Sequence, residues 1–200
     1  MKRFIDLILV IPVAVILLPV FIGLILVIKL SAKGPAVFKQ QRAGKGGESF
    51  IFYKFRTMCT NVDPYGPSPK SGDDPRLTKV GKFLREYSLD ELPQLFNVLK
   101  GDMSIVGPRP LYMDQIKEWD GRQKKRLFVK PGITGLAQIS GRGELTREDK
   151  LELDVKYVEN ASLWFDLKII LITIAHVFCR KSIYEKRYSL TEETRGQNKS

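Results

Sequence analysis

Cysteine and histidine are scarce in this sequence, which limits the chemistry that it can perform. Cys59 and Cys179 are its only cysteines, and they lie far apart and outside any CxxC spacing. This excludes a disulfide framework and a zinc site, and it indicates a reducing, cytosol-facing environment. The single histidine, His176, lies in an apolar segment. We interpret it as a packing residue rather than a base or a metal ligand.

Acidic residues are also few, because 22 Asp and Glu stand against 33 Lys and Arg, for a net charge of +11. Such a charge favours nucleic acid, phosphorylated small molecules or anionic lipid as partners, without choosing among them. The glycine-rich turn GKGGES at 44–49 lacks the GxxxxGK[ST] spacing of a phosphate loop. No helix-turn-helix or aromatic RNA-binding pattern stands out, so we expect no nucleic-acid partner. With 200 residues, there is room for one compact domain and a membrane element.

The region 7–28 contains no charged or strongly polar side chain. As one straight helix it could cross a hydrocarbon core of about 30 Å. The run is longer than the roughly 7 to 15 residues of a signal-peptide core, so we expect the mature protein to keep it. Pro12 and Pro19 each remove a backbone donor, and the sequence predicts a kink or break near Pro19, the more central of the two.

Positive charge flanks both ends of this run, which indicates that both ends prefer the cytoplasm. The residues leave two arrangements open. One is a re-entrant helix that bends at Pro19 and returns to the same face, and the other is an ordinary kinked span. The flanking basic residues are Lys2, Arg3, Lys29, Lys33, Lys39, Arg42 and Lys45.

The remainder of the chain predicts a mainly helical α+β domain. Two extended segments at 36–42 and 49–58 read as a hairpin, and 61–75 reads as a loop that closes over a substrate or simply connects. A helix is expected at 77–87. A second helix is expected to begin at Ser88, which forms an S-x-x-E capping box with Glu91, and to end near Gly101.

Two further helices are expected in the C-terminal part, an amphipathic one at 146–160 and an apolar one at 163–180. The second is either interfacial, on the membrane surface, or a core helix, and the residues leave both open. The residues thus divide the chain into a membrane segment at 1–30, a second domain at 31–185, and a polar tail at 186–200 whose composition suits disorder.

Asp90 and Glu91 are adjacent carboxylates at the expected helix start. The cap explains Glu91, whereas nothing structural requires a second acid at Asp90. A carboxylate kept ionised by a helix start can bind Mg²⁺ or attack phosphorus. Arginine side chains match phosphate oxygens, and four of them lie in or beside motif-like segments rather than along solvated helical faces. These candidate phosphate-binding residues are Arg56, Arg85, Arg109 and Arg142.

The segment Ser88 to Pro110, SLDELPQLFNVLKGDMSIVGPRP, resembles the signature of the bacterial sugar transferases, the monotopic phosphoglycosyl transferases. YKFRTM at 53–58 and KPGITG at 130–135 are similar to two further blocks of that family. The likeness extends from Arg3 to about Phe178. The length is similar to that of the small bacillosamine phosphotransferases.

This resemblance implies a two-step reaction. Asp90 matches the nucleophile that attacks the sugar-bearing phosphate of a UDP-sugar, releases UMP and holds the phospho-sugar as an acyl phosphate. Undecaprenyl phosphate then accepts the group, in the first membrane step of glycoconjugate biosynthesis. Glu91 matches the second acid of the pair, and Mg²⁺ is expected at Asp90. Arg85 and Arg109 match arginines near the phosphates, whereas Arg56 stands where relatives carry lysine.

The resemblance also implies a monotopic protein on the cytoplasmic face of a bacterial inner membrane. Pro19 matches the helix-breaking proline, so the resemblance implies a re-entrant membrane helix at 1–30. It also implies that 31–185 is a cytoplasmic catalytic domain with interfacial helices. The chain departs from some relatives in carrying Leu18 where they have serine, and in its additional Pro12. A non-catalytic scaffold for polysaccharide assembly is the main rival, since charge and membrane contact would suffice for it. The sequence fixes neither the sugar nor the final glycan, whether capsule, O-antigen or protein-linked, and it leaves dimerisation open.

Overall fold

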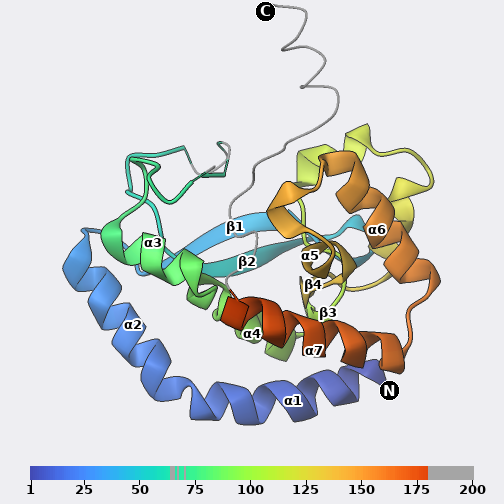
Figure 1. Ribbon diagram of the computed structural model, residues 1–200, viewed down its shortest axis with the longest axis horizontal. Helices are drawn as coiled ribbons and strands as arrows, with labels where there is room; N and C mark the ends of the chain where they lie inside the picture. The colour runs from blue at the N-terminus through green and yellow to red at the C-terminus, as the bar shows by residue number, and fades with distance from the viewer. Residues whose placement is uncertain (64–65, 67, 70, 180–200) are drawn as a thin grey trace, which may run out of the picture.

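A computed structural model describes residues 1–63, 66, 68–69 and 71–179 (Figure 1). These residues form a mainly helical structure with two small β-sheets, so the predicted α+β class is confirmed. The polar tail predicted at 186–200 lies outside the described residues. Four positions of the loop at 61–75 also lie outside them, and its closing over a substrate stays a prediction.

The N-terminal segment consists of two helices, α1 (Lys2–Ile16) and α2 (Leu18–Ser31), bent by 59° at a break between them. The predicted break is confirmed, and it falls at Leu17. Pro19 sits in the first turn of α2, where its missing N–H is not needed by the helix. Pro12 remains inside α1 without ending it. Among the described residues no single helix is long and apolar enough to cross a bilayer, although the bent pair together meets both criteria.

The predicted hairpin is confirmed as strands β1 (Val37–Ala43) and β2 (Ser49–Phe55), which pair in antiparallel register. The short 3₁₀ helix η1 (Lys45–Gly47) forms the turn, and its two glycines have positive φ angles of 72° and 82°. Such angles are accessible to glycine at little cost. Two phenylalanines of β2, Phe52 and Phe55, are buried and pack towards α4 and α2 respectively.

Three short helices follow, α3 (Lys79–Glu86), the 3₁₀ helix η2 (Leu89–Glu91) and α4 (Gln94–Lys100). The capping box predicted at Ser88 is wrong. Ser88 is left-handed (φ 56°) and its side chain makes no capping hydrogen bond, whereas a serine whose side chain caps a helix typically has an extended backbone. Pro93 takes the cap position of α4 instead. The predicted end of the helix is confirmed, with Gly101 left-handed directly after Lys100.

The C-terminal half contains a second sheet of two parallel three-residue strands, β3 (Ser104–Val106) and β4 (Gly132–Thr134). A Cβ on Gly132 would lie 2.1 Å from the backbone nitrogen of Gly107, so the KPGITG block needs glycine there for the strands to approach. The remaining helices are η3 (Met113–Glu118), η4 (Gln123–Phe128), α5 (Leu136–Ile139), η5 (Arg142–Glu144), α6 (Arg147–Glu159) and α7 (Leu163–Cys179).

The sequence left open whether α7 is a core helix or a surface helix. In the structure one of its faces is packed against the domain and another is exposed. Ile169 is fully buried against Val106 and Tyr157, whereas Trp164 is 77% exposed. In Figure 1, α7 runs beside α1 along one side of the molecule, with the hairpin and α6 on the other. One face of α7 therefore completes the core, and the opposite face is apolar and uncovered.

The close approach of α3 to the segment after β2 gives a testable expectation for stability. A Cβ on Gly81 would lie 1.9 Å from the carbonyl oxygen of Thr57, which also accepts a hydrogen bond from the Thr78 N–H. We expect Gly81→Ala to destabilise the fold by about 2 kcal/mol, because about 3 kcal/mol of overpacking exceeds the roughly 1 kcal/mol of helix propensity gained. Thermal unfolding in detergent measures the loss. Gly121→Ala, which meets nothing within 4 Å, is the control, and equal midpoints for the two variants would contradict the expectation.

Candidate active site

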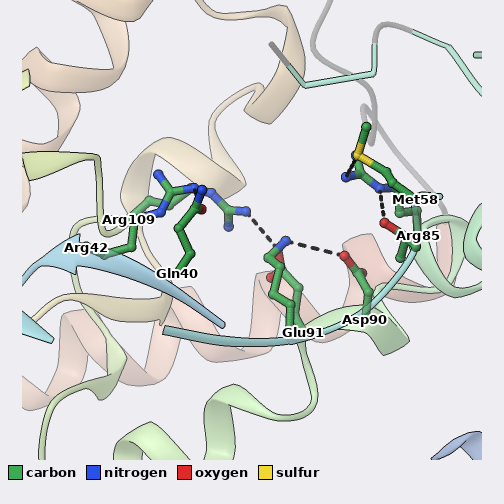
Figure 2. Close-up of polar contacts among 9 residues, drawn as sticks. Gln40, Arg42, Met58, Arg85, Asp90, Glu91 and Arg109 are labelled. Atoms are coloured by element: carbon green, nitrogen blue, oxygen red, sulfur yellow. Dashed lines mark hydrogen bonds and ion pairs between the residues drawn. The ribbon is translucent and has the colours of Figure 1, made fainter. Parts of the chain in front are cut away.

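Asp90 and Glu91 lie together in the single turn of η2, between α3 and α4 (Figure 2). Asp90 is 4% exposed, and the side chain of Glu91 is 12% exposed. Two adjacent carboxylates that are shielded from water repel one another unless neighbouring cations offset their charge. The turn therefore requires positive side chains from other parts of the chain.

Lys54 supplies the first of these charges from the middle of β2. Its Nζ lies 3.3 Å from Oδ2 of Asp90 and 3.2 Å from Oε1 of Glu91, so one ammonium contacts both acids. Arg109, in the GPRP segment after β3, supplies the second, with Nη2 2.8 Å from the same Glu91 oxygen. The structure thus brings together three residues that were predicted from the sequence, Asp90, Glu91 and Arg109. It adds Lys54, which was not predicted.

The other predicted phosphate-binding arginines are placed differently. Arg85 lies on the Asp90 side of the group, where Nε donates to Thr57 Oγ1 at 3.0 Å and Nη2 contacts the Met58 sulfur (Figure 2). Arg56 points its two terminal nitrogens at the carbonyl oxygens of residues 32 and 33, each at 2.7 Å. It is 7% exposed and ties the end of α2 to the hairpin. The side chain of Arg142 lies outside what the structure describes.

Asn97 holds the strand that carries Lys54 against α4. Asn97 is fully buried, its Oδ1 accepts from the Tyr53 N–H at 3.1 Å, and its Nδ2 donates to the Ile51 carbonyl at 2.6 Å. Because these contacts involve the residue directly before Lys54 and a second one two positions earlier, they hold this part of the strand, and with it Lys54, in place relative to α4. A buried amide with its hydrogen bonds satisfied is a rigid support.

The buried ion pair between Arg126 and Asp154 supports the backbone of Arg109. Nη2 of Arg126, in η4, donates to the Arg109 carbonyl oxygen at 2.6 Å and to Oδ2 of Asp154, in α6, at 2.8 Å. Both side chains are less than 5% exposed. Burial raises the pKa of Asp154 even though the Arg126 guanidinium opposes the shift. The pair couples α6 to the loop that delivers Arg109 to Glu91.

The residues present fit a magnesium ion. Carboxylate oxygens are its preferred protein ligands, and it is usually held by one or two carboxylates together with phosphate oxygens and water. Asp90 and Glu91 offer two such oxygens that already converge on one cation, the Lys54 ammonium. Among the described residues no group of three or more His, Cys, Asp or Glu side chains suits a metal, so a closed protein cage of the structural kind does not occur there.

Lys54 was not predicted as a site residue, because the phosphate-binding residue predicted in the YKFRTM block is Arg56. The sequence of the strand nevertheless indicates a role for Lys54. In SFIFYKF, Lys54 is the only charged residue of an otherwise largely apolar, half-buried strand. A charge in that position needs a partner of opposite sign. What the assembled group can do is present one or two carboxylate oxygens to an electrophile while cations neutralise negative charge around them, which is the requirement of phosphoryl transfer.

Comparison with known proteins is consistent with that chemistry. The family model described as bacterial sugar transferase matches residues 1–180. The chain is 47% identical over 172 residues to the uncharacterized sugar transferase EpsL of Bacillus subtilis, covering 86% of this chain and 84% of that protein. It is 50% identical over 153 residues to the galactosyl transferase CpsE of Streptococcus agalactiae, covering 70% of this chain and 34% of that protein.

A third relative is the UDP-glucose:undecaprenyl-phosphate glucose-1-phosphate transferase of Escherichia coli, 42% identical over 192 residues. The match covers 92% of this chain and 41% of that protein. The chain thus spans well under half the length of two of these three relatives. From the match over residues 1–180 and the two relatives above 40% identity that cover most of it, the chain belongs to the bacterial sugar transferase family.

Proposed function

We propose that this protein transfers a sugar-1-phosphate from a UDP-sugar to undecaprenyl phosphate and releases UMP, through a covalent phospho-sugar on Asp90. The observation that carries the proposal is the buried carboxylate pair with Lys54 and Arg109 around it. Relatives named as undecaprenyl-phosphate transferases of glucose-1-phosphate, galactose phosphate and N-acetylgalactosamine phosphate support the reaction class. They do not select the sugar.

In the first step, one Asp90 carboxylate oxygen attacks the phosphorus that bears the sugar. The bond from that phosphorus to the bridging oxygen breaks, and UMP leaves with the electron pair. In the second step, a phosphate oxygen of the lipid attacks the same phosphorus and the bond to Asp90 breaks, which restores the carboxylate and yields the lipid diphosphate-sugar. Each step preserves charge and atoms, and each depends on holding the attacking oxygen in line with the leaving one.

The cations of the group have separate tasks in this scheme. Lys54 is in contact with both acids and keeps their charges compatible at short range. Arg109 contacts Glu91, and its side chain is 38% exposed, so an incoming phosphate can reach its guanidinium. A magnesium ion, held by Asp90 with Glu91 beside it, would supply charge neutralisation at the diphosphate oxygens.

The contacts at both ends of the bent helix pair support a re-entrant arrangement. At the start of α1, Lys2 pairs with Asp166 of α7, and Asp6 accepts from the Ile105 N–H of β3 at 3.1 Å. At the end of α2, Arg56 binds the carbonyl oxygens of residues 32 and 33. Because both ends contact the same domain, a membrane that receives the bend cannot separate them. The pair then enters and leaves on the cytoplasmic side.

The outer surfaces of α1 and α2 provide the apolar contact that such an arrangement needs. The large side chains that are half or more exposed there are Phe4, Ile8, Ile11, Val15, Ile16, Leu18, Ile22, Leu26 and Leu30. The uncovered face of α7 adds Trp164, Leu167, Leu171 and Ile174. Apolar surface of this extent on helices with basic neighbours is typical of proteins that lie in the membrane interface. A lipid phosphate at that interface and a soluble UDP-sugar can then meet at η2.

The arrangement predicts the side on which the N-terminus lies. A cysteine introduced at residue 1 after an initiating methionine, in a Cys59→Ser, Cys179→Ser background, should escape a membrane-impermeant thiol reagent applied to intact cells. It should react once the cells are opened, because the start of α1 lies against the cytoplasmic domain. The exposed Cys59, in a chain that keeps its native cysteines, is the control for a cytoplasmic position, because it should likewise react only once the cells are opened. Labelling of the N-terminal cysteine from outside would sink the re-entrant arrangement.

The reaction is tested with a panel of UDP-sugars, undecaprenyl phosphate and Mg²⁺, with UMP release as the readout. We expect one or a few UDP-sugars to give UMP with the wild type. Intact-mass measurement after donor is added without lipid should show a sugar-phosphate adduct on the protein. If folded wild-type protein gives neither UMP nor adduct with any sugar, the scaffold reading replaces the transferase.

A further inference from the structure

A pocket of about 160 Å³ opens beside Glu91 of the carboxylate pair. Its walls come from η2 and α4, from β4 and α5, and from the end of α7. Glu91 forms part of the wall, so the pocket reaches the residue next to Asp90. Most of its other large side chains are aliphatic, namely Leu92, Leu95, Ile133, Ile139 and Val177.

The pocket continues into the apolar surface of α7. Val177 lines the pocket and is also 37% exposed, one turn beyond Ile174, which is 50% exposed. Leu171 precedes them on the helix at 59% exposure. Apolar side chains therefore extend along α7 from its exposed face to Val177, which lines the same pocket as Glu91.

One polar group in the wall is notable for lacking a partner. The side-chain nitrogen and oxygen of Gln138, in α5, are buried and make no hydrogen bond within the part of the chain that the structure describes. Buried amides without partners are uncommon in native proteins. Gln138 thus offers a donor and an acceptor to whatever enters the pocket.

We propose that this pocket binds the first isoprene units of the polyprenyl phosphate acceptor, with Gln138 donating to its phosphate or to the oxygen that joins phosphate and chain. The inference rests on the proposed function. Its occupant has to be apolar along the walls, anionic at the carboxylate group, and continuous with the membrane-facing side of α7. A prenyl phosphate meets all three conditions. The nucleotide-sugar meets only the second, because it has no apolar chain to lie against five aliphatic side chains.

Because Val177 lines the pocket and is partly exposed, a larger side chain there narrows the pocket without changing the core. We expect Val177→Trp to lower kcat/KM for undecaprenyl phosphate about tenfold, since filling a hydrophobic subsite costs an order of magnitude or more in discrimination. Val177→Phe should give an intermediate loss. Ile174→Trp is the matched control, because it adds the same ring to the same helix outside the pocket, and it should change kcat/KM by less than about twofold.

A lipid-free measurement separates this inference from the proposed function. Exchange of labelled UMP into the UDP-sugar requires Asp90 but no acceptor, and Val177→Trp should leave its rate within about twofold of wild type. Loss of exchange in Val177→Trp, with an unchanged unfolding midpoint, would assign the pocket to the donor and overturn the inference. Absence of exchange in the wild type would instead count against the proposed function.

A short acceptor separates the pocket from the membrane surface. With a soluble two-isoprene prenyl phosphate in place of undecaprenyl phosphate, the loss caused by Val177→Trp should persist at about tenfold, because the units next to the phosphate are those that the pocket holds. If the loss disappears with the short acceptor, or if Ile174→Trp loses as much with the long one, α7 acts through general membrane contact. Either result overturns the inference.

Discussion

Asp90→Asn should reduce UMP release by at least about 10³-fold and abolish the sugar-phosphate adduct, because an amide oxygen does not form the bond to phosphorus that the first step requires. The substitution is nearly isosteric, and the amide oxygen can still accept from Lys54, whose Nζ lies 3.3 Å from the present carboxylate oxygen. The fold should therefore be retained. Steady-state UMP release and intact-mass spectrometry measure the two effects.

Glu91→Gln is the matched comparison for that experiment. It removes the same charge one residue away and leaves an oxygen that Lys54 and Arg109 can still contact. We expect a smaller loss, about 10²-fold, with the adduct still detectable, because Glu91 acts on the charge around the reaction rather than forming the bond. An adduct that persists in Asp90→Asn and vanishes in Glu91→Gln would exchange the two roles. Equal unfolding midpoints for the two variants exclude misfolding as the cause.

The local features around these residues could be read from the sequence. The hairpin follows from two extended runs around a glycine-rich turn, and the end of α4 follows from Gly101 after Lys100. The bend at Leu17 follows from Pro19. Each depends on residues a few positions apart, where backbone sterics decide the outcome.

The features that failed or were missed depend on distant residues or on competition between local signals. Ser88 has the composition of a capping residue, but the chain turns left-handed there and Pro93 starts the helix. The three-residue strands β3 and β4 are too short to give a periodic pattern and lie more than twenty positions apart. Lys54 is near the end of β2 and Arg56 directly follows the strand, yet Arg56 binds backbone carbonyls and Lys54 binds the acids. Only the packed structure distinguishes them.

The second large effect concerns the buried pair behind Arg109. Asp154→Ala should destabilise the fold by about 3–5 kcal/mol, because it leaves the Arg126 guanidinium buried without its counter-charge. Glu152→Ala is a control on the same helix. Glu152 pairs at 2.5 Å with Arg122, the residue directly before η4, but both side chains are more than half exposed. Removal of Glu152 should therefore cost no more than about 1 kcal/mol. Thermal unfolding in detergent compares them, and equal losses would show that the buried pair does not hold η4 to α6.

The opposite truncation, Arg126→Leu, should depend on pH in a way that Asp154→Ala does not. Burial already raises the pKa of Asp154 above its usual 3.8 with Arg126 present, and without that guanidinium the rise is larger. An acid whose pKa is raised on folding favours the folded state at pH values below its unfolded pKa, and that contribution is lost as pH rises through the folded value. The penalty of Arg126→Leu should therefore be smaller at pH 5 than at pH 8.

In Asp154→Ala the buried Arg126 cannot become neutral in the same way, because a guanidinium does not release its proton between pH 5 and pH 8. The penalty of Asp154→Ala relative to wild type should thus not be smaller at pH 5 than at pH 8, in contrast to that of Arg126→Leu. Oδ1 of Asp154 has no hydrogen-bond partner among the described residues, so a proton there meets no competing donor. Parallel pH dependences for the two variants would mean that Asp154 stays ionised without Arg126. The carbonyl of Arg109 would then be held by the remaining packing of its loop rather than by the ion pair.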